Sequence, residues 1–454
     1  MLIFVANVIN MFFSLLTNFL LPKYLSIESY AGIKEFQLYV SYVGLFHFGF
    51  VDGIYLKYGG KTIEKKVDEQ FSTDLSTMRV FQIIITFISI CVSLLLKDRI
   101  LLIFALSIFP QNMANYYKFL YQATGEFELY GRAMNLTSIS TFILNMFLLF
   151  VIKTDDLYLY IIGYLIVFIG IWVLLEYKFS KKHTIIKGKL FSTKRFYENI
   201  KSGFLLTLGN LSSMFLTTMD RWFVKFLLDT YAFAQYSFAV SVESFLNLAI
   251  TPVTTTLYNY FCQENNKNEH QKIFNYVVVF ASLVPASAFI VQIILDIFLT
   301  KYSASSIVTI LLFASQMFYI VIKSIYVNLY KVQRKQKTYF LKLIAILFIG
   351  FIFNCICFYL IRSKEAFAIG TLLSSIVWFI ISTFDFRYIC SNRKVYLYLF
   401  LELVCFLYIG AQNQPIVGLI IYVFITITLC IIFMKSTFFE LYNKVKFLLK
   451  KGVK

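Results

Sequence analysis

Charged side chains inside apolar stretches are the residues of this sequence best suited to chemistry. Glu243 and Lys323 each lie well within a long apolar stretch, and Asp220 and Arg221 are neighbours within another. A charge at the centre of a bilayer costs at least about 2.5 kcal/mol, so such residues usually face a polar cavity. Arg221 and Lys323 favour an anion such as phosphate, whereas Glu243 and Asp220 could bind a coupling ion. Asp220 and Arg221 could instead form only a neutralising structural pair.

Five further polar residues lie in or at the ends of apolar stretches, and most have a purely structural alternative. Lys23 and Lys225 occupy matching ends of two stretches, from which their ammonium groups could reach lipid headgroups instead of a substrate. Asp52 lies in the inner third of the second stretch and is a third candidate for ion coupling. Asn145 and Asn354 could contact a sugar, or they could simply hydrogen-bond one helix to another.

The elements that must position these residues are membrane-spanning helices. Of the 454 residues, 59% are hydrophobic and 15% are charged, against about 25% charged in soluble proteins. A bilayer-spanning helix needs about 20 apolar residues, which predicts about fourteen spans with short connections. Met1 opens directly into the first span without a signal-peptide pattern, and the second span is expected to be continuous over Phe36–Lys57. We therefore predict an all-α polytopic membrane protein.

The net charge of +18 is explained by membrane topology better than by nucleic-acid binding. Roughly thirty of the basic residues fall after even-numbered spans and in the C-terminal tail, and roughly ten fall after odd-numbered spans. Cytoplasmic loops retain positive charge, so both termini are predicted to be cytoplasmic. Residues 435–454 alternate apolar and basic residues at helical spacing, which suits an amphipathic helix on the membrane surface.

An internal repeat divides the chain. One constant offset matches Leu102, Tyr117 and Asn145 to Leu311, Tyr326 and Asn354, and the same offset matches Lys153 to Arg362. The matched spans lie six apart, so the two halves share one orientation, as in transporters built from parallel repeats. We expect a six-helix bundle over residues 1–177, a basic cytoplasmic linker over 178–200 and a second six-helix bundle over 201–388. Two additional spans follow over 389–434, before the tail at 435–454.

Enzyme chemistry has little support in the residues. No nucleotide-binding glycine loop is present, and no serine–histidine or paired-carboxylate arrangement stands out. The three histidines are far apart and the seven cysteines lie mostly in apolar runs, so we expect no metal site and no cofactor. Two similar bundles with charged groups inside the spans favour a transporter working by alternating access.

The residues from Phe19 to Gly60 carry a resemblance to a known family. The segment FLLPKYLS, the following YAG and the run YVSYVGLFHFGFVDGIYLKYGG are similar to the start of polysaccharide-biosynthesis flippases of the Wzx type. Tyr236-Ser237-Phe238-Ala239, which opens the second half, also resembles that family. Length, span number and basic linker agree with it along the whole chain. The family belongs to the multidrug, oligosaccharidyl-lipid and polysaccharide exporter superfamily.

The resemblance implies a function and partners. It implies translocation of an undecaprenyl-diphosphate-linked oligosaccharide from the cytoplasmic to the outer leaflet of the bacterial plasma membrane, for a surface polysaccharide such as O-antigen or capsule. It implies contacts with membrane lipids, with a polysaccharide polymerase and with glycosyltransferases, but with no nucleic acid. In this interpretation Arg221, Lys323, Lys225 and Lys23 receive the diphosphate. The alternatives are an ion-coupled multidrug antiporter of the same superfamily and a membrane sugar polymerase or acyltransferase.

The topology can be tested by reporter fusions. A fluorescent protein fused after Lys454 is expected to fluoresce, and alkaline phosphatase fused there is expected to be inactive, because the C-terminus is predicted to be cytoplasmic. Fusions after Asp156, in a predicted outer loop, should show the opposite behaviour. Active phosphatase after Lys454 would overturn the predicted topology.

Overall fold

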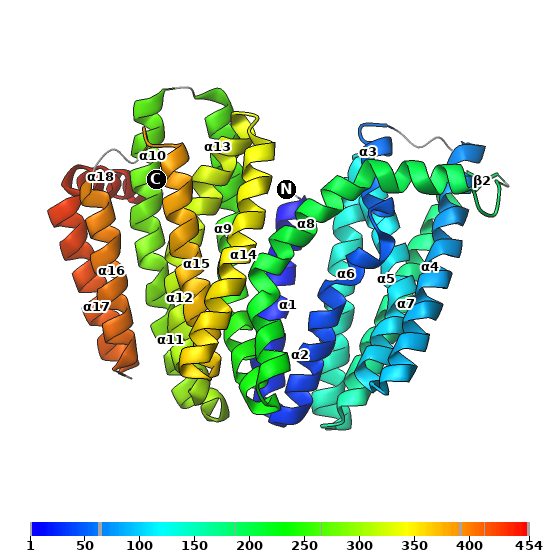
Figure 1. Ribbon diagram of the computed structural model, residues 1–454, viewed down its shortest axis with the longest axis horizontal. Helices are drawn as coiled ribbons and strands as arrows, with labels where there is room; N and C mark the ends of the chain where they lie inside the picture. Colours follow the sequence, from blue (N-terminus) through cyan, green and yellow to red (C-terminus); the bar gives the residue numbers. More distant parts are fainter. Residues whose placement is uncertain are drawn as a thin grey trace. The chain divides into compact units, whose positions relative to one another are not determined.

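The computed structural model describes residues 2–61, 66–186, 188–264, 266–389, 393–412 and 414–451, and these residues are predominantly helical (Figure 1). Part of the predicted C-terminal tail, from Gly452 to Lys454, lies outside the described residues. The chain separates into two compact units, Met1–Met214 (unit 1) and Phe215–Lys454 (unit 2). Because this division falls inside a helix, it does not decide the bundle limits predicted from the sequence, which stay a prediction.

Unit 1 begins with the elements of the first half of the chain, in which η1 is a 3-10 helix and η2 is a π-helical turn. In order they are α1 (Leu2–Tyr24), α2 (Ile27–Ser41), η1 (Val43–His47), α3 (Phe50–Tyr58), β1 (Lys66–Val67), α4 (Glu69–Leu96), α5 (Arg99–Ala123), α6 (Phe127–Met146), η2 (Phe147–Ile152), α7 (Leu157–Lys182), β2 (Thr184–Ile185) and the first part of α8 (Thr193–Leu227). The two short strands pair in parallel.

Unit 2 begins within α8 and contains the remaining helices, with η5 as a second π-helical turn. In order they are α9 (Thr230–Gln263), α10 (Lys267–Leu283), η3 (Val284–Ala286), α11 (Ser287–Ile297), η4 (Thr300–Ser305), α12 (Ser306–Val321), η5 (Ile322–Tyr326), α13 (Val327–Val332), α14 (Gln336–Ile361), α15 (Lys364–Asp385), α16 (Arg393–Ala411), α17 (Pro415–Phe433) and α18 (Lys435–Lys451).

The helices have the length and composition of membrane spans. Among the described residues, 10 helical segments are long and apolar enough to cross a membrane. The four other predicted spans coincide with α1, with α2 to α3, with α5 and with α8. Many large apolar side chains on these helices are exposed, as lipid-facing residues must be; Leu95, for example, is 82% exposed. The protein is therefore a polytopic, all-helical membrane protein.

Acidic residues are scarce, and several of them begin helices. Asp68, Asp98, Asp156 and Asp229 are the N-caps of α4, α5, α7 and α9, and each side chain accepts a hydrogen bond from a backbone N–H of the first turn. This satisfies donors that have no partner inside the helix and places negative charge at the positive end of the helix dipole. The short connections of the chain are thereby fixed at the residue where each helix starts.

The second predicted span is interrupted, which corrects the expectation of a continuous helix over Phe36–Lys57. The α-helix ends at Ser41, η1 follows, and α3 starts only at Phe50. The physical reason is backbone conformation, because Phe48 and Gly49 adopt positive φ angles of 49° and 90°. Two consecutive left-handed residues cannot continue a right-handed helix.

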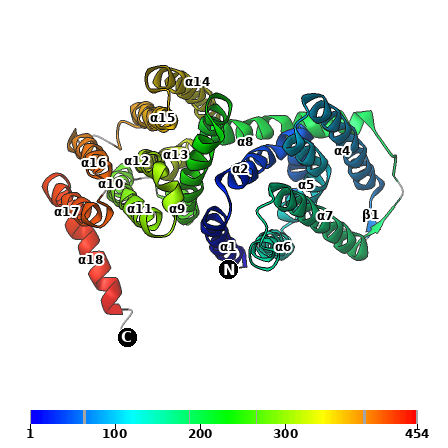
Figure 2. The same cartoon turned by 90° about the horizontal axis from the view of Figure 1, so that it is seen from below.

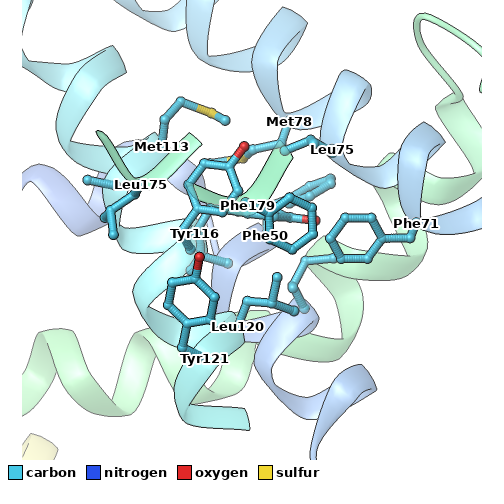
Figure 3. Close-up of a cluster of buried hydrophobic side chains, with 14 of the residues drawn as sticks. Phe50, Phe71, Leu75, Met78, Met113, Tyr116, Leu120, Tyr121, Leu175 and Phe179 are labelled. Atoms are coloured by element: carbon cyan, nitrogen blue, oxygen red, sulfur yellow. The ribbon is translucent and has the colours of Figure 1, made fainter. Parts of the chain in front are cut away.

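A cluster of buried aromatic and aliphatic side chains forms the core of unit 1 (Figure 3). Phe50 of α3, Phe71 of α4, Tyr116 of α5 and Phe179 of α7 are all at most 1% exposed. The Phe71 and Phe179 rings are stacked with centroids 5.5 Å apart. α5 contacts α2, α3, α4, α6 and α7, so it is the central helix of this unit.

α12 has the corresponding central place in unit 2. It packs against α9, α10, α11, α15 and α16 (Figure 2). Within the segment Thr300–Val332, 83% of the most apolar window is buried, against 22% for Gln336–Ile361, which contains α14. Polar groups on α12 are therefore enclosed by protein rather than by lipid.

The internal repeat has structural counterparts. α5 packs on α7 and α2, and the repeat-related α12 packs on α15 and α9. The repeat-related residues Lys153 and Arg362 both end a helix in the left-handed conformation, with φ angles of 55° and 49°. Asn145 and Asn354 are both 1% exposed. Equivalent positions therefore share backbone conformation and burial.

Glycines allow α3 and α8 to approach closely within unit 1. A methyl group on Gly203 of α8 would lie 2.0 Å from the carbonyl oxygen of Gly49 and 2.3 Å from the backbone nitrogen of Gly53. These are backbone atoms, which cannot move aside as a flexible side chain can. By contrast, a methyl group on Gly209 of the same helix would meet no atom within 4 Å.

This contrast gives a matched pair of variants. Gly203→Ala is expected to destabilise the protein by about 1–3 kcal/mol, because the added methyl group overpacks the crossing. Gly209→Ala is expected to leave stability unchanged or to raise it by up to about 1 kcal/mol, because alanine favours helix. Thermal unfolding of the purified protein in detergent measures both, and equal melting temperatures for the two variants would contradict the close crossing.

Candidate functional site

A cavity of about 300 Å³ in unit 2 brings four of the predicted site residues together. It lies among α8, α9, α12 with η5, and α15. We call it the charged cavity and define it by the lining residues Leu216, Thr217, Asp220, Arg221, Val240, Glu243, Ser244, Asn247, Gln316, Tyr319, Lys323 and Thr371. Two bases and two acids thus share one enclosed space, although they come from three different helical segments.

Asp220 is held by neutral donors. Its side chain is on a residue that is 6% exposed; one oxygen accepts a hydrogen bond of 2.6 Å from the Tyr236 hydroxyl, and the other accepts one of 2.8 Å from the Arg221 backbone N–H. The guanidinium Nε of Arg221 is buried with no hydrogen-bond partner among the described residues. The side chain of Arg221 therefore has a donor available to a ligand.

Glu243 and Lys323 also take neutral partners. The Gln316 amide donates a hydrogen bond to Glu243, and Lys323 Nζ donates one of 2.9 Å to Asn247 Oδ1. Lys323 Nζ also lies 5.5 Å from the centroid of the Tyr319 ring. Lys323 occupies the π-helical turn η5 that follows α12, and such turns frequently occur at functional sites. An ammonium held by an amide and a ring keeps its charge for an anion.

The sequence argument did not single out the neutral partners in this cavity. Gln316, Tyr319 and Lys323 are spaced by three and four residues, and Glu243 and Asn247 by four. Such spacings place side chains on one face of a helix. Polar residues at helical spacing from an intramembrane charge were therefore the signal that could have found them.

Lys225 and Lys23 do not line the charged cavity. Lys225 Nζ lies 5.7 Å from the Trp222 ring centroid and 5.8 Å from that of Phe226, on the last turn of α8. Lys23 is in the last turn of α1 and belongs to unit 1. These positions fit cationic groups near the ends of spans.

The other predicted residues are distributed over both units. Asp52 is 3% exposed and accepts a hydrogen bond from the Thr207 hydroxyl across the α3–α8 crossing. Asn354 packs against α15, where a methyl group on Gly370 would lie 2.5 Å from its Oδ1 atom. Both side chains therefore join helices, and neither lines the charged cavity.

Asn145 lies in a second cavity of about 250 Å³, within unit 1. We call it the neutral cavity and define it by the lining residues Phe13, Ser14, Thr17, Asn18, Phe36, Gln37, Val40, Ser138, Thr141, Asn145, Tyr164 and Phe168. The Tyr164 hydroxyl donates a hydrogen bond of 2.8 Å to Asn145 Oδ1. None of these described lining residues carries a charge.

Solved structures with this arrangement of helices are transport proteins. A structure of the lipid II flippase MurJ in an inward closed conformation matches with a TM-score of 0.73 and 16% identity, covering 96% of this chain and 99% of that one. An inward-facing multidrug resistance MATE family transporter of the MOP superfamily matches with a TM-score of 0.52 and 12% identity, covering 84% and 96%. The chain shares the fold of these membrane transport proteins.

This likeness confirms the predicted fold class and no more, because the identities are low. No family model matches the sequence, and no curated protein matches it. The resemblance to Wzx-type flippases therefore stays a prediction. The assignment of individual residues to substrate binding or ion coupling is likewise a prediction, now attached to a defined cavity.

The hydrogen bond between Tyr236 and Asp220 can be tested by its removal. Tyr236→Phe is expected to lower the free energy of unfolding by about 1–3 kcal/mol, because a buried carboxylate loses one donor. Tyr231→Phe is the matched control, since Tyr231 lies on the same helix and is 45% exposed. Thermal unfolding in detergent measures both variants, and equal stability of the two would show that the bond contributes nothing.

Proposed function

We propose that this protein is a flippase that moves an undecaprenyl-diphosphate-linked oligosaccharide across the bacterial plasma membrane. The transfer runs from the cytoplasmic to the outer leaflet by alternating access and serves surface polysaccharide synthesis. The observation that carries the proposal is the charged cavity, in which Arg221 and Lys323 are enclosed by protein and have neutral hydrogen-bond surroundings.

The physical need for such a cavity follows from the substrate. The sugar hydroxyls and the diphosphate would lose their water in hydrocarbon, at a cost of several kcal/mol for each polar group. Charge-assisted hydrogen bonds from a guanidinium and an ammonium can replace part of that water around phosphate oxygens. The guanidinium of Arg221 suits paired phosphate oxygens, and the ammonium of Lys323 acts as a point charge.

The fold supports the same proposal. The lipid II flippase matches over almost the whole of both chains, and its printed name describes movement of a lipid. The two helices α16 and α17, which follow the second repeat, pack against each other and against α10. We assign to them the role of a groove for the lipid tail.

Ion coupling is proposed for Glu243 or Asp220, because both share the cavity with the cations that would hold the substrate. Occupation of a carboxylate by a proton or metal ion would change the net charge of the cavity and hence its affinity for the diphosphate. Asp52 has less support, since its carboxylate is engaged by Thr207 in the other unit. Lys23 and Lys225 would guide the diphosphate near the membrane surface.

The location of the protein is part of the proposal. We place it in the bacterial plasma membrane with both termini in the cytoplasm, where glycosyltransferases assemble the substrate. A polysaccharide polymerase would receive the product on the outer side. The distribution of basic residues between alternate connections supports this orientation.

A multidrug antiporter is the second candidate, and one observation favours it. The charged cavity contains two carboxylates, Asp220 and Glu243, which would attract an organic cation, and the fold is shared with a multidrug transporter. The cations Arg221 and Lys323 oppose this function, because they would repel a positively charged drug. A polymerase or acyltransferase has the least support, since the matching structures are transport proteins.

Substitutions of the two cations test the flippase proposal. Arg221→Ala and Lys323→Ala are each expected to reduce transport at least tenfold, since each removes a charge-assisted hydrogen bond worth about 1.5–3 kcal/mol. Surface glycan restored in a flippase-deficient strain is the readout, at matched protein levels. Lys337→Ala is the control, because Lys337 is exposed in α14.

Two outcomes would contradict the proposal. Full restoration of surface glycan by both alanine variants would show that these cations do not hold the diphosphate. If neither wild type nor variants restore glycan, while wild-type cells gain resistance to cationic drugs that Glu243→Gln abolishes, the antiporter function holds instead.

A further inference from the structure

The two cavities differ in charge although repeat-related helices contribute to both. α1 and α2 line the neutral cavity, and α8 and α9 line the charged cavity. Asn18 of α1 corresponds to Asp220 of α8 at the same sequence offset that matches Lys23 to Lys225. An amide in one unit therefore occupies the place of a carboxylate in the other.

A buried lysine fixes the chemistry of the neutral cavity. Lys34 is 5% exposed, and its Nζ donates hydrogen bonds of 2.7 Å to Asn18 Oδ1 and 3.2 Å to Gln37 Oε1. The oxygens of both lining amides are thus engaged, which leaves their nitrogens as the donor ends. Asn145 is arranged likewise, because its Oδ1 atom accepts from Tyr164.

These features exclude two classes of ligand. A cation is disfavoured, because the nearby ammonium of Lys34 repels it and the amide oxygens that would coordinate it are already occupied. A diphosphate is disfavoured, because no cationic side chain is among the described lining residues. The volume of about 250 Å³ is also far larger than a single water molecule or ion requires.

The remaining chemistry matches a saccharide. Amide nitrogens donate hydrogen bonds, and the hydroxyls of Ser138 and Thr141 both donate and accept them, as sugar hydroxyls do. Aromatic rings supply flat apolar surface for the C–H faces of a sugar ring. Phe36 and Tyr164, both of which line the cavity, are stacked with centroids 6.3 Å apart.

We propose that the neutral cavity of unit 1 is a subsite for the saccharide part of the substrate, separate from the charged cavity that takes the diphosphate. This inference rests on the proposed flippase function and adds a specificity site to it. Its members are Asn18, Gln37, Ser138, Thr141 and Asn145, with Lys34 orienting the first two. The neutral cavity discriminates among oligosaccharides, and the charged cavity binds the part that all lipid diphosphates share.

Two probes separate the subsites. The first is the intact lipid-linked oligosaccharide extracted from the producing cells. The second is the undecaprenyl diphosphate that remains after mild acid hydrolysis removes the sugar. Binding of each to the purified full chain in detergent is measured by native mass spectrometry.

The test variant combines Ser138→Ala with Thr141→Val, which removes two hydroxyls at little change in volume. It should bind the intact probe about tenfold more weakly than wild type does, since two hydrogen bonds are lost. It should bind undecaprenyl diphosphate as wild type does, which also shows that the variant is folded. Thr428→Val, at an exposed threonine of α17, is the matched control and should change neither affinity.

The outcomes distinguish this inference from the function on which it rests. Unchanged binding of the intact probe by the double variant, or an equal loss for both probes, overturns the saccharide subsite and leaves the flippase function standing. If wild type binds neither probe, the flippase function itself is wrong, and the subsite with it. Arg221→Ala should weaken binding of both probes, because the diphosphate is common to them.

Discussion

The cost of placing polar and charged groups inside a membrane is the constraint on which the rest of this structure depends. Each intramembrane acid described here meets a neutral donor: Asp220 meets Tyr236, Glu243 meets Gln316, and Asp52 meets Thr207. Hydrogen bonds of this kind reduce the desolvation penalty of a buried group. Because the acids are satisfied without consuming Arg221 or Lys323, those cations keep their capacity to bind an anion.

The same constraint explains which helices carry the site. α12 is the most enclosed span of unit 2, and it bears Gln316 and Tyr319, with Lys323 in the adjoining turn. Lipid-facing helices such as α14 present large apolar side chains outward, with Phe348 67% exposed. A cationic group on such a surface would face hydrocarbon, whereas on the central helix it faces other protein groups.

The repeat supplies two similar scaffolds that carry different chemistry. Packing partners, left-handed helix ends and buried asparagines recur at equivalent places, so the backbone arrangement is shared. The cavities nevertheless differ, because Asn18 stands where Asp220 stands in the second copy. Changing a few side chains on a common framework is sufficient to produce one charged cavity and one neutral cavity. This arrangement allows the diphosphate and the saccharide to be recognised by separate groups.

The sequence by itself determined the polytopic helical class, nearly all of the spans and the charged residues worth testing. It could do so because apolar length and the cost of intramembrane charge act locally along the chain. Only the tertiary structure decided that Arg221, Glu243 and Lys323 share one cavity, that Asn354 instead packs against Gly370, and that the second span breaks at Phe48 and Gly49. These outcomes depend on which helices pack together and on backbone angles. Neither hydropathy nor spacing along one helix contains that information.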